Sequence, residues 1–205
     1  MDTAHDGGPD AVDELSSLYE RLKEEEMHAK LLQYKNKSMG ATALHLAALN
    51  GHAEIVKFIV DCIKEDFSDE RANMVNKVNK FQFTPLMCAC SRGYLSKNQA
   101  NVQENRLKIV KCLVDAGASV NYYTQDTLMT AAHWASYKKD DKVVEFLLEN
   151  GAPHFHFSHM ERLPIDVAGS SRAYKVVDVY LEKYLESQIP EATNMAGTAQ
   201  EEIKR

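Results

Sequence analysis

The 205-residue chain is 44% hydrophobic and 26% charged, a composition that is ordinary for a folded protein and excludes general disorder. Its formal net charge of −6 disfavours binding to nucleic acid or anionic lipid. No apolar run is long enough to cross a bilayer and no secretory signal is present, so we expect a soluble protein of the cytoplasm, with the nucleus as an alternative.

Residues 1–37 predict an N-terminal tail and a capping helix. Apolar residues at helical spacing form one stripe over 15–22 and a second over 27–34, and the two stripes point in different directions. The acidic run Glu24–Glu26 lies at the change. Either the helix breaks there, or one helix is wedged between two surfaces. A helical cap on the following segment is favoured over a coiled coil, because the heptad pattern fails at the acidic run.

A short phrase then recurs four times, and aliphatic pairs one helical turn apart follow each copy. The copies are Thr42-Ala-Leu-His-Leu-Ala-Ala48, Thr84-Pro-Leu-Met-Cys-Ala-Cys90, Thr130-Ala-Ala-His-Trp-Ala-Ser136 and Leu163-Pro-Ile-Asp-Val-Ala-Gly169. Such repetition indicates a stack of small units rather than one closed core. Small residues in each phrase let a first helix approach its neighbours, and the aliphatic pairs give a second helix an apolar stripe.

The phrases resemble the Thr-Pro-Leu-His-x-Ala signature of ankyrin repeats, whose period is about 33 residues. The resemblance implies an all-α solenoid of stacked helix–turn–helix units with short hairpin loops and an N-terminal helical cap. It covers four repeats, and a polar tail or linker follows at 185–205. The repeat boundaries are about 38–76, 77–121, 122–154 and 155–184. Insertions around 62–74 and 95–105 account for the longer spacings, and the second is either a tolerated surface loop or a contact finger.

The same resemblance assigns roles to turn residues and histidines. Gly51 and Gly93 follow first helices, where the backbone is left-handed, and Lys139 and Arg172 occupy that position in later repeats. Gln82 stands where the family has a turn glycine. The remaining residues of interest, His45 and His133, are expected to hydrogen-bond the adjacent loop backbone as scaffold, and Asp166 replaces that histidine in the last repeat.

Trp134 and four cysteines lie inside predicted helices and are expected to serve packing, with the alternative for Trp134 that its large ring reaches an edge of the core. Cys62, Cys88, Cys90 and Cys112 lack the paired spacing of a zinc site, so we interpret them as buried free thiols in a reducing compartment.

His154, His156 and His159 form the most metal-like cluster of the sequence. Three imidazoles suit zinc, but zinc ligands normally come from more than one element. Exposed partner-contacting residues are therefore the favoured interpretation, and we expect no cofactor.

In ankyrin proteins the hairpin tips and the edges of the first helices line a concave, partner-binding face. Phe81 and Phe83 alternate around a turn residue, so they cannot easily both be buried, and exposed aromatics are favoured anchors. The positions that correspond to this face are Lys80, Phe81, Phe83, Ser91, Arg92, Asp126, Thr127, Met129, Tyr137, Lys138, His159, Met160 and Arg162.

The resemblance implies a non-catalytic module or adaptor, monomeric alone, that binds a protein partner through the concave face. The sequence lacks a phosphate-binding glycine loop, a nucleophile elbow and convergent carboxylates, and it has no basic stripe for nucleic acid. The alternative is a regulatory ankyrin domain of a larger enzyme or membrane channel.

Overall fold

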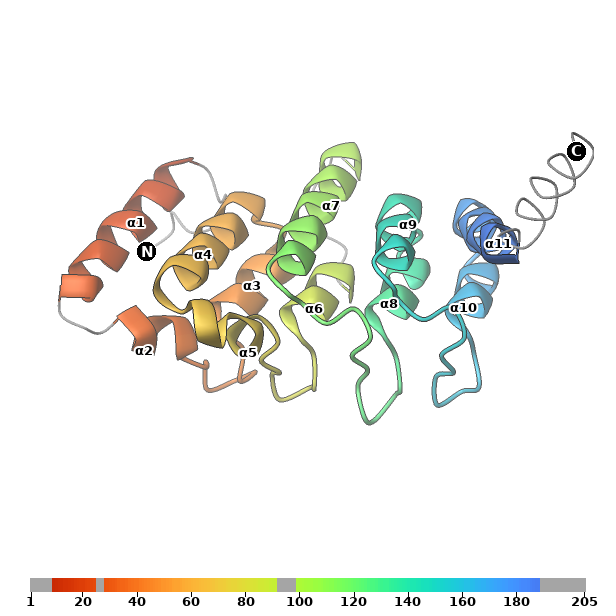
Figure 1. Ribbon diagram of the computed structural model, residues 1–205, viewed down its shortest axis with the longest axis horizontal. Helices are drawn as coiled ribbons and strands as arrows, with labels where there is room; N and C mark the ends of the chain where they lie inside the picture. Colours follow the sequence, from red (N-terminus) through yellow and green to blue (C-terminus); the bar gives the residue numbers. More distant parts are fainter. Residues whose placement is uncertain (1–8, 25–27, 92–98, 189–205) are drawn as a thin grey trace, which may run out of the picture.

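The computed structural model describes residues 9–24, 28–91 and 99–188, and the described residues are almost entirely helical (Figure 1). The described residues contain no β-strand and a single isolated antiparallel bridge, between Tyr123 and Thr130. The α-helices are α1 Pro9–Glu24, α2 His28–Gln33, α3 Ala43–Asn50, α4 Ala53–Asp66, α5 Arg71–Val75, α6 Pro85–Ser91, α7 Gln99–Asp115, α8 Ala131–Tyr137, α9 Asp141–Glu149, α10 Pro164–Ser170 and α11 Tyr174–Gln188, with a 3₁₀ turn, η2, at Ser68–Glu70.

Four helix pairs, α3–α4, α6–α7, α8–α9 and α10–α11, stack in a row between the N-terminal helices and the C-terminal end (Figure 1). The first helices pack in the order α3, α6, α8, α10, and the second helices pack in the order α4, α7, α9, α11. The predicted all-helical solenoid is therefore confirmed, with one pair for each of the four phrases.

Residue size explains why the pairs stack. Ala48, Ala89, Ala132 and Ala168 are fully buried, and because they are small the first helices can approach closely. The second helices bury aliphatic stripes against them, among which Val56, Val60, Ile109, Val110, Leu113, Val143, Val144, Leu147 and Val176 are at most 1% exposed. Since one pair cannot bury its own stripe, each pair depends on its neighbours.

The N-terminal segment forms two helices, since α1 ends at Glu24 and α2 begins at His28. This agrees with the first alternative, in which the helix breaks at the acidic run. Helix α1 packs on α4. The buried Tyr19 hydroxyl donates to Asp66 Oδ2 at 2.7 Å, and Lys23 Nζ lies 2.9 Å from Asp66 Oδ1. These two partners hold the pKa of Asp66 below its ordinary value. They fix the cap at the end of α4.

Both predicted insertions are largely helical. Helix α4 runs to Asp66, and η2 and α5 fill the rest of the first insertion. The interpretation of the second insertion as a loop is wrong from Gln99 onward, because α7 begins there; residues 95–98 lie outside the described range. Arg106, buried in an ion pair, anchors this longer helix. Helix α11 likewise continues to Gln188, beyond the expected end of the last repeat near 184.

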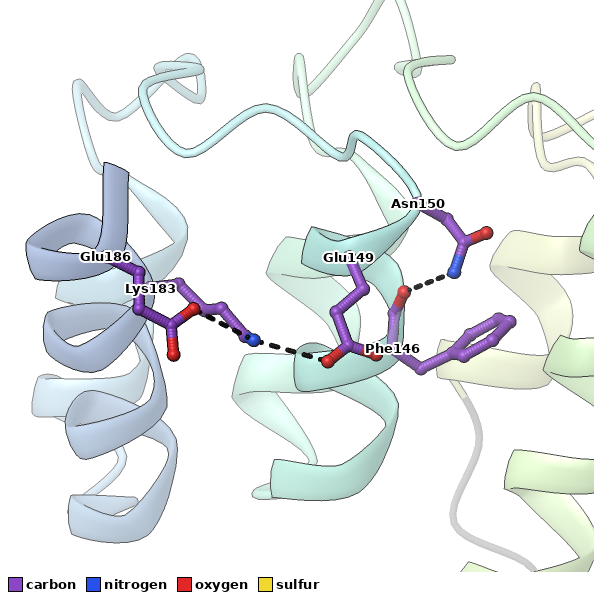
Figure 2. A network of polar contacts seen from close by, with 5 residues as sticks. All are labelled: Phe146, Glu149, Asn150, Lys183 and Glu186. Atoms are coloured by element: carbon purple, nitrogen blue, oxygen red, sulfur yellow. Dashed lines mark hydrogen bonds and ion pairs between the residues drawn. The ribbon is translucent and has the colours of Figure 1, made fainter. Parts of the chain in front are cut away.

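The second helices of the last two pairs are joined by a surface network (Figure 2). Lys183 Nζ on α11 lies 3.2 Å from Glu149 Oε1 on α9 and 3.2 Å from Glu186 Oε2 on its own helix. Asn150 Nδ2 donates to the Phe146 carbonyl at 2.8 Å and satisfies the end of α9. Exposed pairs of this kind stabilise weakly, so burial carries most of the interface.

The turns adopt the backbone that the sequence predicts. Gly51 is left-handed at φ 83°, and Lys139 and Arg172 take φ values of 60° and 57° at the equivalent positions. Gln82, in the hairpin before α6, is left-handed at φ 62°. Gly93 lies outside the described residues. Non-glycine residues therefore adopt the strained turn geometry because the flanking helices impose it.

Candidate functional site

The hairpin loops are held to the helix pairs by buried imidazoles. The Thr42 backbone N–H donates to His45 Nδ1 at 3.2 Å, so the ring proton lies on Nε2, which donates to the Phe83 carbonyl of the next hairpin at 3.0 Å. His133 repeats this arrangement, with Nε2 3.1 Å from the Arg162 carbonyl. The predicted scaffold role of both histidines is confirmed.

Burial keeps both rings neutral. It lowers the pKa of His45 to about 4 and lowers that of His133. The other two units lack the bridge: Met87 stands at this position in the second, and in the fourth Asp166 Oδ2 only accepts the Leu163 N–H at 2.9 Å. Neither imidazole is free for acid–base chemistry, because both nitrogens are already bonded.

The structure places the predicted contact residues in three groups. Large apolar side chains stand out from the surface at Phe81 (59% exposed), Tyr137 (55%) and Met160 (73%). Arg92 lies outside the described residues. The exposed polar residues are Lys80, Asp126, Thr127, His159 and Arg162, and the half-buried residues are Phe83, Ser91, Met129 and Lys138.

An aromatic strip connects the second and third units on this surface. The Phe83 ring lies 5.3 Å from the Trp134 ring, and Trp134 meets Tyr137 edge to face at 6.5 Å. Lys138 Nζ lies 5.4 Å from the centre of the Tyr137 ring, within cation–π range. Phe81 is thus the exposed member of the alternating pair, and Phe83 is the packed one.

Trp134 belongs to this strip, although the sequence assigned it to packing. Its ring is half-buried, and its buried Nε1 has no hydrogen-bond partner among the described residues. The signal was present in the sequence, because Trp134 stands where the other phrases carry smaller apolar residues. The exposed part of the Trp134 ring is therefore an apolar contact surface within the strip.

Some predicted contact residues also hold the hairpins together. Lys80 Nζ donates to the Lys37 carbonyl at 2.6 Å, and the Lys80 N–H donates to the Met39 carbonyl at 2.9 Å. In the last two hairpins the His159 N–H donates to the Thr127 carbonyl at 2.8 Å. The first two hairpin tips, and likewise the last two, are therefore bonded through their backbones, which restricts their movement within each pair.

The three candidate metal ligands point into different surroundings. His154 packs edge to face on Tyr180 at 6.3 Å, the His156 ring lies tilted against Tyr123 at 4.9 Å, and His159 is exposed. Across the described ranges, no group of three or more His, Cys, Asp or Glu is placed to hold a metal ion. The structure therefore does not bring these histidines together.

The four cysteines are free, and three of them are buried. Burial raises the pKa of Cys88 and of Cys90 to about 12 and that of Cys62 to about 11. A thiol with such a pKa is protonated and inert at neutral pH. The cysteines therefore serve packing.

A comparison with protein families matches this architecture. A family model described as Ankyrin repeats (3 copies) matches residues 1–98 and 75–156. No curated protein matches the chain. In the part of the chain that the structure describes, no helix is both long and apolar enough to span a membrane.

Proposed function

The chain belongs to the ankyrin-repeat family, and from this premise we propose that it is a non-catalytic module that binds a protein partner through its hairpin tips and first-helix edges. Ankyrin repeats are generally protein–protein interaction modules and are typically non-catalytic. The observation that carries the proposal is the aromatic strip of Phe83, Trp134 and Tyr137, together with the exposed Phe81 and Met160 in the second and fourth hairpins.

The chemistry of these side chains supports the choice of surface. Aromatic residues bury a large area with few rotatable bonds, and they dominate the binding energy of many interfaces. Lys80, Asp126 and Arg162 supply a polar rim around them. Backbone bonds within the first pair and within the last pair of hairpins order these parts of the surface in advance, so docking there loses less conformational entropy.

A test begins with affinity capture from native extract, identification of the captured protein and titration of the purified pair. Phe81→Ala with Tyr137→Ala should weaken the affinity on the order of tenfold to a hundredfold, because both side chains are exposed anchors. Tyr174→Ala, on the 69% exposed Tyr174 of α11, is the matched control and should bind normally. Unchanged affinity of the double variant, or an equal loss in the control, would refute this surface.

A second candidate is a regulatory ankyrin domain within a larger enzyme or membrane channel, and one observation favours it. Helix α11 leaves Tyr174, Leu181 and Leu185 at least 49% exposed along one helical stripe, a surface on which a further module would pack. The size of the endogenous protein on an immunoblot tests this candidate. A band at the 23.1 kDa of this chain would exclude it.

We also propose that the protein works in a reducing compartment, the cytoplasm or the nucleus. The four free cysteines support this. A fluorescent fusion localised to a secretory organelle would contradict it.

A further inference from the structure

Charge is distributed very unevenly along this acidic chain. Of its 30 acidic residues, none lies in 27–53 or 71–103, the segments that contain the first two hairpins and the helices α2, α3, α5 and α6. These two segments carry a net charge of +8. Because the net charge of the whole chain is −6, the remaining residues carry −14. The basic residues are Lys30, Lys35, Lys37, Arg71, Lys77, Lys80, Arg92 and Lys97.

The first two hairpins enclose a shallow hollow of about 570 Å³. Gly40 at its edge is left-handed, and a Cβ there would lie 2.9 Å from Lys80 Cγ, so glycine is what permits the hairpins to approach. The hollow is lined by Lys35, Asn36, Lys37, Gly40, Val78, Asn79 and Lys80.

Two lysines hold the hollow in shape from opposite sides. Lys35 Nζ reaches from the first hairpin to the Val78 carbonyl at 2.8 Å, and Lys80 Nζ reaches from the second hairpin to the Lys37 carbonyl at 2.6 Å. An ammonium group has three N–H donors, so each of these groups keeps donors for a ligand. The reciprocal bonds fix two positive charges at the rim before any ligand binds.

The positive charge of this site is not neutralised. Among the described residues, the lining lysines Lys35, Lys37 and Lys80 form no ion pair with a carboxylate, and neither does Lys77, which precedes Val78 of the lining in the chain. Burial and then the nearby charge of Lys35 lower the pKa of Lys77, and Glu70 opposes them only in part. A negatively charged ligand would relieve this repulsion.

We propose that the hollow binds an acidic segment of the partner protein, a run of Asp or Glu with an apolar residue beside it. Phe81, 59% exposed and next to Lys80 in the chain, receives the apolar residue. This inference rests on the proposed function and names the partner chemistry of one end of that surface. A short peptide is favoured over nucleic acid because the rest of the chain is strongly acidic and would repel an extended polyanion.

The test is a fluorescence-anisotropy titration of the full chain with a labelled peptide of repeating Glu-Glu-Leu, against matched Gln-Gln-Leu and Lys-Lys-Leu peptides. The acidic peptide should bind tightest, and its affinity should fall as ionic strength rises. Lys37→Gln with Lys77→Gln removes two charges and leaves both reciprocal bonds intact. It should weaken binding about tenfold. Lys142→Gln with Lys175→Gln, exposed lysines on α9 and α11, is the control.

Equal binding of the acidic and neutral peptides, or of the two double variants, would overturn the inference. So would tighter binding of single-stranded DNA or of vesicles containing an anionic lipid, because the ligand would then not be a protein segment. A different result would be a captured partner that loses affinity for Phe81→Ala with Tyr137→Ala and yet binds Lys37→Gln with Lys77→Gln as tightly as the parent protein. That result would support the proposed function and refute this inference alone.

Discussion

Replacing Arg106 with Met should destabilise the fold by about 3–5 kcal/mol. Arg106 Nη1 lies 2.6 Å from Asp140 Oδ2, and the two side chains are 4% and 1% exposed. Methionine keeps much of the apolar stem but leaves the Asp140 carboxylate buried without its cation. Because this pair joins α7 of the second unit to the start of α9 in the third, the loss falls on one interface of the stack.

Urea unfolding followed by two probes measures both the size and the place of this loss. Circular dichroism reports all the helices, whereas the fluorescence of Trp134, the single tryptophan, reports the third unit. The two transitions should coincide in the parent protein. In Arg106→Met the fluorescence transition should move to lower urea and precede the other, because the smaller C-terminal half is then uncoupled.

Lys108→Met is a matched control on the same helix. Lys108 also pairs with a carboxylate, Glu104 at 2.9 Å, but both side chains are exposed, so the loss of stability should be far smaller than that at Arg106. Adding Asp140→Asn to Arg106→Met should recover part of the stability, since asparagine still accepts the Val143 N–H and carries no charge. Equal losses at Arg106 and Lys108, or no recovery, would refute the reasoning.

Three further predictions concern pH, a turn and thiol reactivity. Burial lowers the pKa of His45 to about 4, against about 6.5 in the unfolded chain. The neutral ring therefore contributes about 3 kcal/mol to the free energy of unfolding above pH 6.5, and this contribution is lost as the pH falls toward 4. Urea midpoints across this pH range measure the loss. Gly40→Ala forces a left-handed alanine against Lys80 and should lower the unfolding free energy by about 1–3 kcal/mol in the same titration. A thiol-specific disulfide reagent should modify half-buried Cys112 before fully buried Cys90.

Each of these predictions has a control and an outcome that contradicts it. His45→Gln should flatten the pH profile, and an unchanged slope would show that another group titrates. Gly151 is also left-handed, at φ 83°, but a Cβ added there has nothing within 4 Å. Gly151→Ala should therefore lower the unfolding free energy only by the cost of the left-handed backbone, which is less than the loss in Gly40→Ala. Equal losses would contradict the close approach of Gly40 to Lys80. Reaction of Cys90 at the rate of Cys112 in the folded protein would contradict its burial.

The helix pairs could be predicted from the sequence because the information is local. Three of the four phrases begin with Thr, and each phrase contains an alanine and is followed by an aliphatic pair within about one repeat. The left-handed positions at Lys139 and Arg172 follow from register alone. The insertion before Arg106 misled the prediction because asparagine and glutamine favour loops on average. Tertiary anchoring by the Arg106–Asp140 pair overrides that preference from Gln99 onward.

The lysine bonds between the first two hairpins could not be predicted, because their partners are distant in the chain. Lys35 meets Val78, and Lys80 meets Lys37, at separations of 43 residues. The register of one hairpin against the next decides both contacts, and composition does not reveal it. The same holds for the exposure of Trp134, which depends on where Phe83 packs.

The first and third interfaces between units have an imidazole bridge and the second does not, and this pattern explains why the candidate surface centres on the second interface. His45 joins the first unit to the second hairpin, and His133 joins the third unit to the fourth hairpin. Where Met87 replaces the imidazole, the buried Arg106–Asp140 pair connects the outer helices instead. The hairpin side of that interface lacks an imidazole bridge, and the rings of Phe83 and Trp134 meet there. A partner that covers these rings would add contacts at the one interface where the scaffold has no imidazole bridge, so binding should also stabilise the stack.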